Sequence, residues 1–151
     1  MFGYGECVQA KYSMKSNGVI EVHNSQYGEG KYNQIKGTVK CKGAKCKVGF
    51  SPFITGDYRI VETDYDNYAV VYSCTPYPFF KNEIVWILTR ARIPDASVIT
   101  TAENMIKAKL PKYSLDNFKK TEQGGTCQYL HEEYVAPAWE RCSLHLRFKP
   151  W

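Results

Sequence analysis

Apolar and polar residues alternate along most of the first 90 residues, and this period of two indicates strands with one buried face. In the first such segment Val8, Ala10 and Tyr12 share one face, whereas Gln9 and Lys11 share the other. Short clusters of Gly, Asn, Ser and Pro separate the segments, as turns between strands do. The pattern predicts seven strands, at residues 6–14, 19–24, 34–41, 46–50, 58–62, 68–74 and 83–90.

The period changes to about 3.6 residues after the seventh strand. Pro94 and Asp95 open a helix that Pro111 closes. Apolar residues recur between them at helical spacing: Val98, Ile99, Ala102, Met105, Ile106 and Leu110. Seven closely spaced strands followed by one amphipathic helix predict an all-β fold with one C-terminal α-helix. The strands would form an antiparallel up-and-down barrel, closed or nearly closed, with the helix packed outside it.

The two central strands are joined by the polar segment Thr63–Asn67. Asp and Asn tolerate left-handed backbone angles and hydrogen-bond their own turn, so this segment predicts a tight hairpin connection. The spacing of its aspartates also suggests a calcium-binding loop. That interpretation fails because Ala69 stands where the sharp turn needs Gly and Thr75 stands where a bidentate Glu is needed.

Composition narrows the class of protein. The 151 residues are enough for one domain with a real core, and no apolar run reaches about 18 residues, so no membrane span is expected. The net charge of +5 is mild, and no basic block is interleaved with stacking aromatics, which argues against nucleic-acid binding. Six cysteines favour an oxidising compartment, whereas residues 1–7 do not form a signal peptide. We therefore expect that the natural chain begins further upstream.

The sequence contains no recognisable pattern of catalytic or metal-binding residues. Cys41 and Cys46 are spaced like half of a metal site, but the three histidines are dispersed, so a disulfide across the hairpin or two packed thiols is the better interpretation. Glu62 and Glu83 fit strand surfaces better than an acid–base pair. We expect the protein not to be an enzyme.

Four segments in order resemble the lipocalin family, in its apolipoprotein D, insect bilin-binding and crustacyanin branch. The hairpin segment Thr-Asp-Tyr-Asp-Asn-Tyr-Ala, which leads into Tyr-Ser-Cys at residue 74, resembles the second signature of that family. Residues 5–13, 86–90 and 120–127 resemble its second strand, its third signature and its C-terminal segment. The Gly-x-Trp strand that opens the family fold has no counterpart, and residues 130–151 match nothing in the family. The resemblance implies that residues 1–129 form an N-terminally truncated, incomplete barrel with about seven of the eight family strands. Residues 130–151 would then be a tail that does not belong to the family fold.

The resemblance also implies a ligand site inside the barrel. Tyr12, Asn24, Tyr58 and Trp86 fall on pocket positions of the family. Apolar positions on the neighbouring strands would line the same cavity: Val8, Ala10, Val22, Ile60 and Val70. A family disulfide matches Cys7 and Cys127, which leaves the pairing of Cys74 and Cys142 open. In the family, the Arg at the position of Arg90 usually lies over the Trp of the first strand in a cation–π contact. That Trp is absent from this sequence.

We therefore expect a secreted carrier that binds a small hydrophobic ligand, such as a bilin, carotenoid, retinoid or fatty acid, in the barrel cavity. No cofactor is required in this interpretation, although a bilin, carotenoid or lipid can be bound. Two alternatives remain: a truncated lipocalin with impaired binding, and a protein-interaction module that uses the aromatic loop Tyr77–Phe80. An open barrel edge would also allow self-association.

Overall fold

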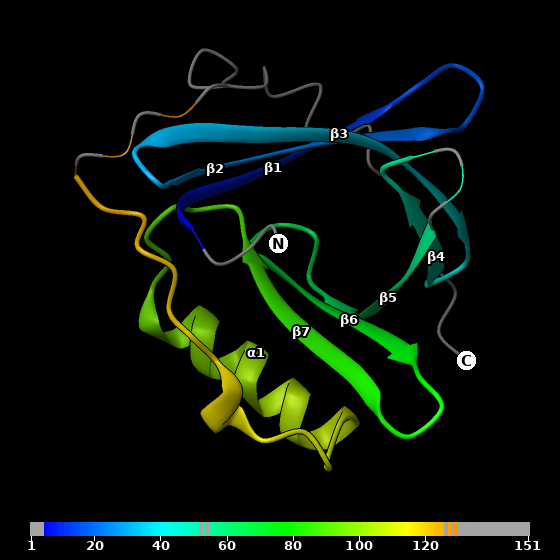
Figure 1. Ribbon diagram of the computed structural model, residues 1–151. Helices are drawn as coiled ribbons and strands as arrows, with labels where there is room; N and C mark the ends of the chain where they lie inside the picture. The colour runs from blue at the N-terminus through cyan, green and yellow to red at the C-terminus, as the bar shows by residue number, and fades with distance from the viewer. Residues whose placement is uncertain (1–4, 52, 54, 126, 128, 130–151) are drawn as a thin grey trace.

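The computed structural model describes residues 5–51, 53, 55–125, 127 and 129. Seven antiparallel strands form one sheet in the order β1 to β7, and the sheet curls into a half-barrel (Figure 1). The strands are β1 (Glu6–Met14), β2 (Ile20–Gly28), β3 (Lys31–Lys42), β4 (Lys45–Gly49), β5 (Thr55–Thr63), β6 (Tyr68–Pro76) and β7 (Lys81–Thr89). The helix α1 (Ala96–Lys109) and a short 3₁₀ helix, η1 (Leu115–Asn117), follow the sheet. The predicted fold class is confirmed, and β1 and β7 are the edges of the described sheet.

The hairpin formed by β2 and β3 is longer than predicted. Residues 26–33, which we expected to form a loop, continue β2 and β3 until the turn at Gly28 to Lys31. Gly30 adopts the left-handed φ of 75° that this tight turn requires. The rings of Tyr27 and Tyr32 lie opposite each other, 5.1 Å apart between centroids. This cross-strand aromatic contact extends the ladder through a segment whose polar composition suggested a loop.

The β5–β6 hairpin is closed by one carboxylate, as its sequence predicted. Asp64 Oδ1 accepts hydrogen bonds from the backbone N–H groups of Asn67 (2.8 Å) and Tyr68 (2.9 Å). Arg90, at the end of β7, donates from Nε and Nη2 to the carbonyl oxygen of Tyr65, at 3.2 and 3.0 Å. Arg90 therefore ties the end of the sheet to this hairpin.

The sheet packs apolar side chains on both of its faces. The inner face of the curl carries a cluster of buried residues: Ile20, Val22, Val39 and Cys46. The outer face of β6 and β7 carries a second cluster, formed with the buried face of α1: Tyr68, Val70, Val85, Ala102 and Ile106. Helix α1 contacts β5 and β6, so the helix lies outside the curl, as predicted (Figure 1).

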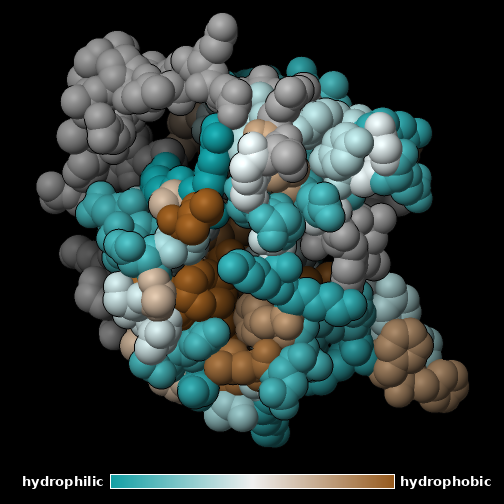
Figure 2. Space-filling view, turned by 90° about the vertical axis from the view of Figure 1, so that its left-hand side faces the viewer, coloured by the Kyte–Doolittle hydropathy of each residue, from teal (hydrophilic) through white to brown (hydrophobic). Residues whose placement is uncertain are grey.

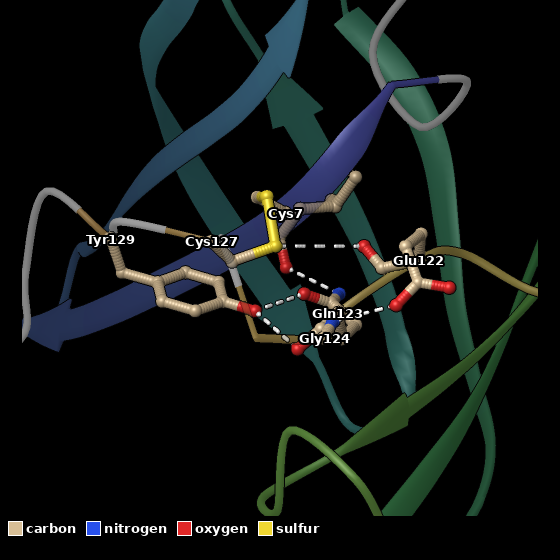
Figure 3. The surroundings of a disulfide bond; sticks show 7 residues. Cys7, Glu122, Gln123, Gly124, Cys127 and Tyr129 are labelled. Carbon is tan, nitrogen blue, oxygen red and sulfur yellow. Dashed lines mark hydrogen bonds between the residues drawn. A yellow bond between two sulfur atoms is a disulfide. The ribbon is translucent and has the colours of Figure 1, made fainter.

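The segment after the helix returns to the start of β1 (Figure 3). A disulfide joins Cys7 to Cys127, as the family resemblance predicted, and the N–H of Cys7 donates to the carbonyl of Glu122 at 2.8 Å. Gln123 Nε2 donates to the carbonyl of Val8 at 2.8 Å, and the Tyr129 hydroxyl donates to Gln123 Oε1 at 2.6 Å. These contacts fix β1 at a point where its pairing with β2 is interrupted by a bulge.

The second disulfide, Cys41–Cys46, crosses the β3–β4 hairpin. Cys74 is the one free cysteine in the described part of the chain. Cys142 and the predicted tail at 130–151 lie outside the described residues, and the division of the chain near residue 129 stays a prediction.

Candidate functional site

Three aromatic side chains from distant strands meet on the inner face. The hydroxyls of Tyr12 on β1 and Tyr58 on β5 are hydrogen-bonded at 2.9 Å. The rings of Tyr58 and Trp86 are stacked, with centroids 6.5 Å apart and an interplanar angle of 25°. Since Trp86 belongs to β7, the three residues connect the two edge strands of the sheet through its middle. Three of the four pocket positions that the family resemblance implied therefore lie together.

The two phenols of this site stay neutral. Burial raises the pKa of Tyr58, and the neighbouring Tyr12 hydroxyl raises it further. Burial also raises the pKa of Tyr12, although its hydrogen bond to Tyr58 acts in the opposite direction. Both side chains therefore offer uncharged hydroxyl groups throughout the physiological pH range.

Asn24 brings an unsatisfied polar group to the same face. It lies two residues beyond Val22 on β2, opposite Ala10 of β1 and Ile35 of β3. Its Oδ1 is buried and has no hydrogen-bond partner among the described residues. A buried acceptor without a partner is costly in a folded protein, and a ligand hydroxyl or N–H group would satisfy it.

The apolar positions predicted for the site fall into three groups. Val22 is buried in the inner cluster, and Ile60 packs against it. Ala10 is exposed opposite Asn24, and Val8 lies at the bulge of β1. Val70 does not join them, because it is fully buried on the other face of the sheet, against α1.

The neighbour of Val70 occupies the inner position instead. Val71 lies directly opposite Trp86 in the β6–β7 pairing and is buried. The sequence analysis also missed Val39 and Cys46, which belong to the inner cluster with Val22. Pairing β6 against the Trp86 position would have found Val71, since residues directly opposite in an antiparallel ladder share a face.

The inner positions defined by this register are almost all uncharged. They include Ile20, Asn24, Ile35, Val48, Ile60, Val71, Ile84 and Leu88. Lys31, exposed at the start of β3, is the charged residue of this face at its rim. Figure 2 shows a face of the molecule on which apolar side chains gather in the centre and polar side chains surround them. The arrangement suits an apolar molecule with a small polar group.

The aromatic loop between β6 and β7 lies at one end of the sheet. The rings of Tyr77 and Phe80 are stacked 4.6 Å apart, and the side chain of Phe79 is 99% exposed. Phe53, in the β4–β5 connection, is 95% exposed. Both connections lie at the same end of an up-and-down sheet, since alternate connections share an end.

Within the described residues, no three His, Cys, Asp or Glu side chains are grouped so that they could hold a metal ion. No described helix is both long enough and apolar enough to cross a membrane.

The fold is that of a lipocalin. Residues 3–125 match the model of the lipocalin / cytosolic fatty-acid binding protein family, and the chain belongs to that family, whose members carry small hydrophobic ligands. The branch is that of apolipoprotein D and the insect bilin-binding proteins, as predicted.

Sequence comparisons with individual proteins support the assignment to this branch of the family. The chain is 35% identical to mouse (Mus musculus) apolipoprotein D over 136 residues, which cover 85% of this chain and 71% of that protein. It is 43% identical to bovine (Bos taurus) apolipoprotein D over 96 residues, 59% of this chain and 51% of that protein. The Lazarillo protein of Schistocerca americana is 34% identical over 129 residues, 79% of this chain and 59% of that protein. The chain thus spans between half and about seven-tenths of these relatives.

Solved structures support the fold. Lobster apocrustacyanin A1 superposes with a TM-score of 0.73 at 23% identity, covering 84% of this chain and 73% of that one. Insecticyanin from the tobacco hornworm Manduca sexta gives a TM-score of 0.72 at 20% identity, covering 85% and 75%.

Proposed function

We propose that this protein is an extracellular carrier that binds one small hydrophobic ligand on the inner face of the sheet. The observation that carries the proposal is the contact of Tyr12, Tyr58 and Trp86 across the curl, beside the buried apolar cluster of the inner face. The two disulfides support a location in an oxidising compartment.

Binding would rest on burial of apolar surface. A ligand that loses about 300 Å² of apolar surface gains on the order of 7 kcal/mol before the costs of ordering it. The rings of Tyr58 and Trp86 would supply a flat contact surface, and the hydroxyl pair and Asn24 would orient a polar group of the ligand. Because this lining is uncharged apart from Lys31 at its rim, a neutral polar group such as a hydroxyl fits its interior better than a carboxylate does. Within the expected ligand classes this favours a retinoid alcohol, hydroxylated carotenoid or similar molecule over a fatty acid.

The test is a titration of all-trans-retinol into the full chain and into Trp86→Ala, followed by retinol fluorescence. We expect the variant to bind more weakly by about 2 kcal/mol, or roughly 30-fold, because the indole is the largest single contact surface of the site. Phe79→Ala is the matched control, since it removes an aromatic ring that is 99% exposed and packs against no site residue. Equal losses in both variants would place the ligand elsewhere.

Two other functions remain, and the same titration separates the first of them from the carrier function. A lipocalin with impaired binding would bind retinol weakly even in the unsubstituted chain, which the open edges at β1 and β7 favour. A protein-interaction module is favoured by the exposed ring of Phe79, and Phe79→Ala would then abolish capture of the partner while leaving retinol affinity unchanged.

A further inference from the structure

Positive charge is concentrated on the outer face of β3, β4 and β5, on the other side of the sheet from the ligand site. Five cationic side chains form this basic face: Lys40, Lys42, Lys45, Lys47 and Arg59. They lie directly opposite one another in the ladder, as the pairs Lys40–Lys47, Lys42–Lys45 and Lys45–Arg59. All five are exposed.

The basic face is poorly neutralised by the protein itself. Asp57 is its one carboxylate among the described strand residues, and it is shared between Lys47 Nζ, at 3.8 Å, and Arg59 Nε, at 2.7 Å. Lys40, Lys42 and Lys45 have no ion-pair partner within the described residues. Five cations against one carboxylate leave a local charge of +4, compared with +5 for the whole chain. The basic face therefore carries most of the net positive charge of the chain.

This arrangement is unfavourable for the isolated protein. Neighbouring strands lie about 4.8 Å apart, and residues on one face of a strand recur at about 7 Å, so the five charges lie within roughly one Debye length of each other. Like charges directly opposite each other destabilise a sheet. A multivalent anion laid along the strands would remove this repulsion, whereas a single small anion would offset only part of it.

The positive surface continues along β3 onto the first two strands. Lys36 lies opposite His23, which lies opposite Lys11, and all three line a shallow depression of about 130 Å³ together with Ser13 and Glu21. A linear ligand could therefore follow the outside of the curl from β5 to β1 (Figure 1).

We propose that the basic face binds a linear sulfated polysaccharide. Lysine ammonium groups act as exposed point charges, which suits an anionic polymer read by charge more than a ligand read by bidentate geometry. None of the five positions is aromatic, so the stacking contacts that single-stranded nucleic acids require are not part of this face. The choice of polysaccharide over lipid rests on the proposed extracellular location, because the strongly anionic leaflet of a cell membrane faces the cytoplasm.

Sulfated-polysaccharide binding would not compete with carriage of the hydrophobic ligand. Along these strands Cys41, Cys46 and Tyr58 point to the inner cluster, whereas the adjoining Lys40, Lys45 and Arg59 lie on the outer face. The alternation of a β-strand thus gives one segment two separate binding faces. The carrier could be held on an extracellular matrix while its inner face exchanges ligand.

The experiment measures heparin affinity of the full chain by calorimetry between 50 and 400 mM NaCl. The test variant is Lys40→Gln/Lys42→Gln/Lys45→Gln, and the control is Lys107→Gln/Lys112→Gln/Lys120→Gln, which removes the same charge from exposed sites on and after α1. We expect the Kd of the test variant at 100 mM NaCl to rise about tenfold or more and that of the control to rise less than twofold. The slope of log K against log salt should fall in magnitude by about 2 to 3 in the test variant, since each lost contact releases about one counterion fewer.

Equal losses in the two variants would overturn the proposal, because binding would then depend on net charge alone. Failure of the unsubstituted chain to bind heparin at 50 mM NaCl would overturn it as well. Binding to vesicles containing phosphatidylserine, equal to heparin binding and lost in the test variant, would assign the face to lipid instead. Retinol affinity of the test variant separates this inference from the carrier function, since it should remain unchanged whether or not heparin binds.

Discussion

At the scale of single residues, Asn24 is the most informative side chain of the site. Its Oδ1 is buried without a hydrogen-bond partner in the described structure, so the unliganded protein carries the cost of removing this group from water. Asn24→Leu should therefore raise the free energy of unfolding of the unliganded protein by about 1 kcal/mol, because it replaces the amide with an apolar group of similar size. Thermal denaturation without ligand measures this gain.

The control for that substitution is Asn33→Leu on the neighbouring strand. Asn33 Nδ2 donates to the carbonyl of Gly28 at 3.3 Å, so its replacement should destabilise the protein. If Asn24→Leu also lowered the melting temperature, Oδ1 would have a partner in solution. The site would then lack the unmet acceptor that favours a hydroxyl-bearing ligand.

At the scale of elements, the β5–β6 hairpin depends on Asp64. Burial tends to raise the pKa of this carboxyl, but the hydrogen bonds from Tyr68 and Asn67 outweigh it and hold the pKa below its ordinary value. A carboxyl whose pKa is lower in the folded state stabilises the protein at pH values above about 3.9, its value in the unfolded chain. This stability is lost as the pH falls from there through the folded-state pKa.

We expect Asp64→Ala to lower the free energy of unfolding by about 1 kcal/mol at pH 7, which is a typical value for an exposed carboxylate that caps backbone N–H groups. The difference from the unsubstituted chain should shrink as the pH falls from about 3.9 through the folded-state pKa of the carboxyl. Urea denaturation at pH 7, 5 and 3 measures it, with Asp66→Ala in the same turn as control. A pH-independent difference would show that the side chain acts through turn conformation alone.

Periodicity and turn chemistry predicted the elements well, but not their register. The family resemblance grouped Tyr12, Val22, Tyr58 and Ile60 inside the barrel, and in the structure these four residues belong to one inner cluster. Val70 was misplaced because a bulge lies between Ile60 and Glu62, so counting in twos across the hairpin changes face there. A bulge adds one residue to one strand and leaves the composition unchanged, so no pattern in a single sequence marks it.

At the scale of the whole molecule, the two edge strands of the described sheet determine whether the protein self-associates. β1 and β7 end the described sheet, and an edge strand offers unpaired backbone donors and acceptors to another chain. Within the described residues, the contacts of Glu122 and Gln123 with Cys7 and Val8 cover only the start of β1. We expect the chain to self-associate as its concentration increases, and light scattering from about 5 to 200 µM should show a rising mass. A constant monomer mass over this range would mean that the edges are covered.

The two disulfides should contribute very unequally to the stability of the whole chain. Cys7 and Cys127 are 120 residues apart, whereas Cys41 and Cys46 are 5 apart, so the first bridge restricts the unfolded chain far more. The loop-entropy relation gives about 5 kcal/mol for the long loop and about 2 kcal/mol for the short one. Cys7→Ala/Cys127→Ala should therefore lower the Tm by roughly 10 °C or more, and Cys41→Ala/Cys46→Ala by roughly 5 °C. The two pairs are well matched, because Cys7 is 5% exposed and Cys46 is 2% exposed. Equal decreases in Tm, measured by scanning calorimetry at one protein concentration, would show that local packing at the cysteines outweighs the restriction of the unfolded chain.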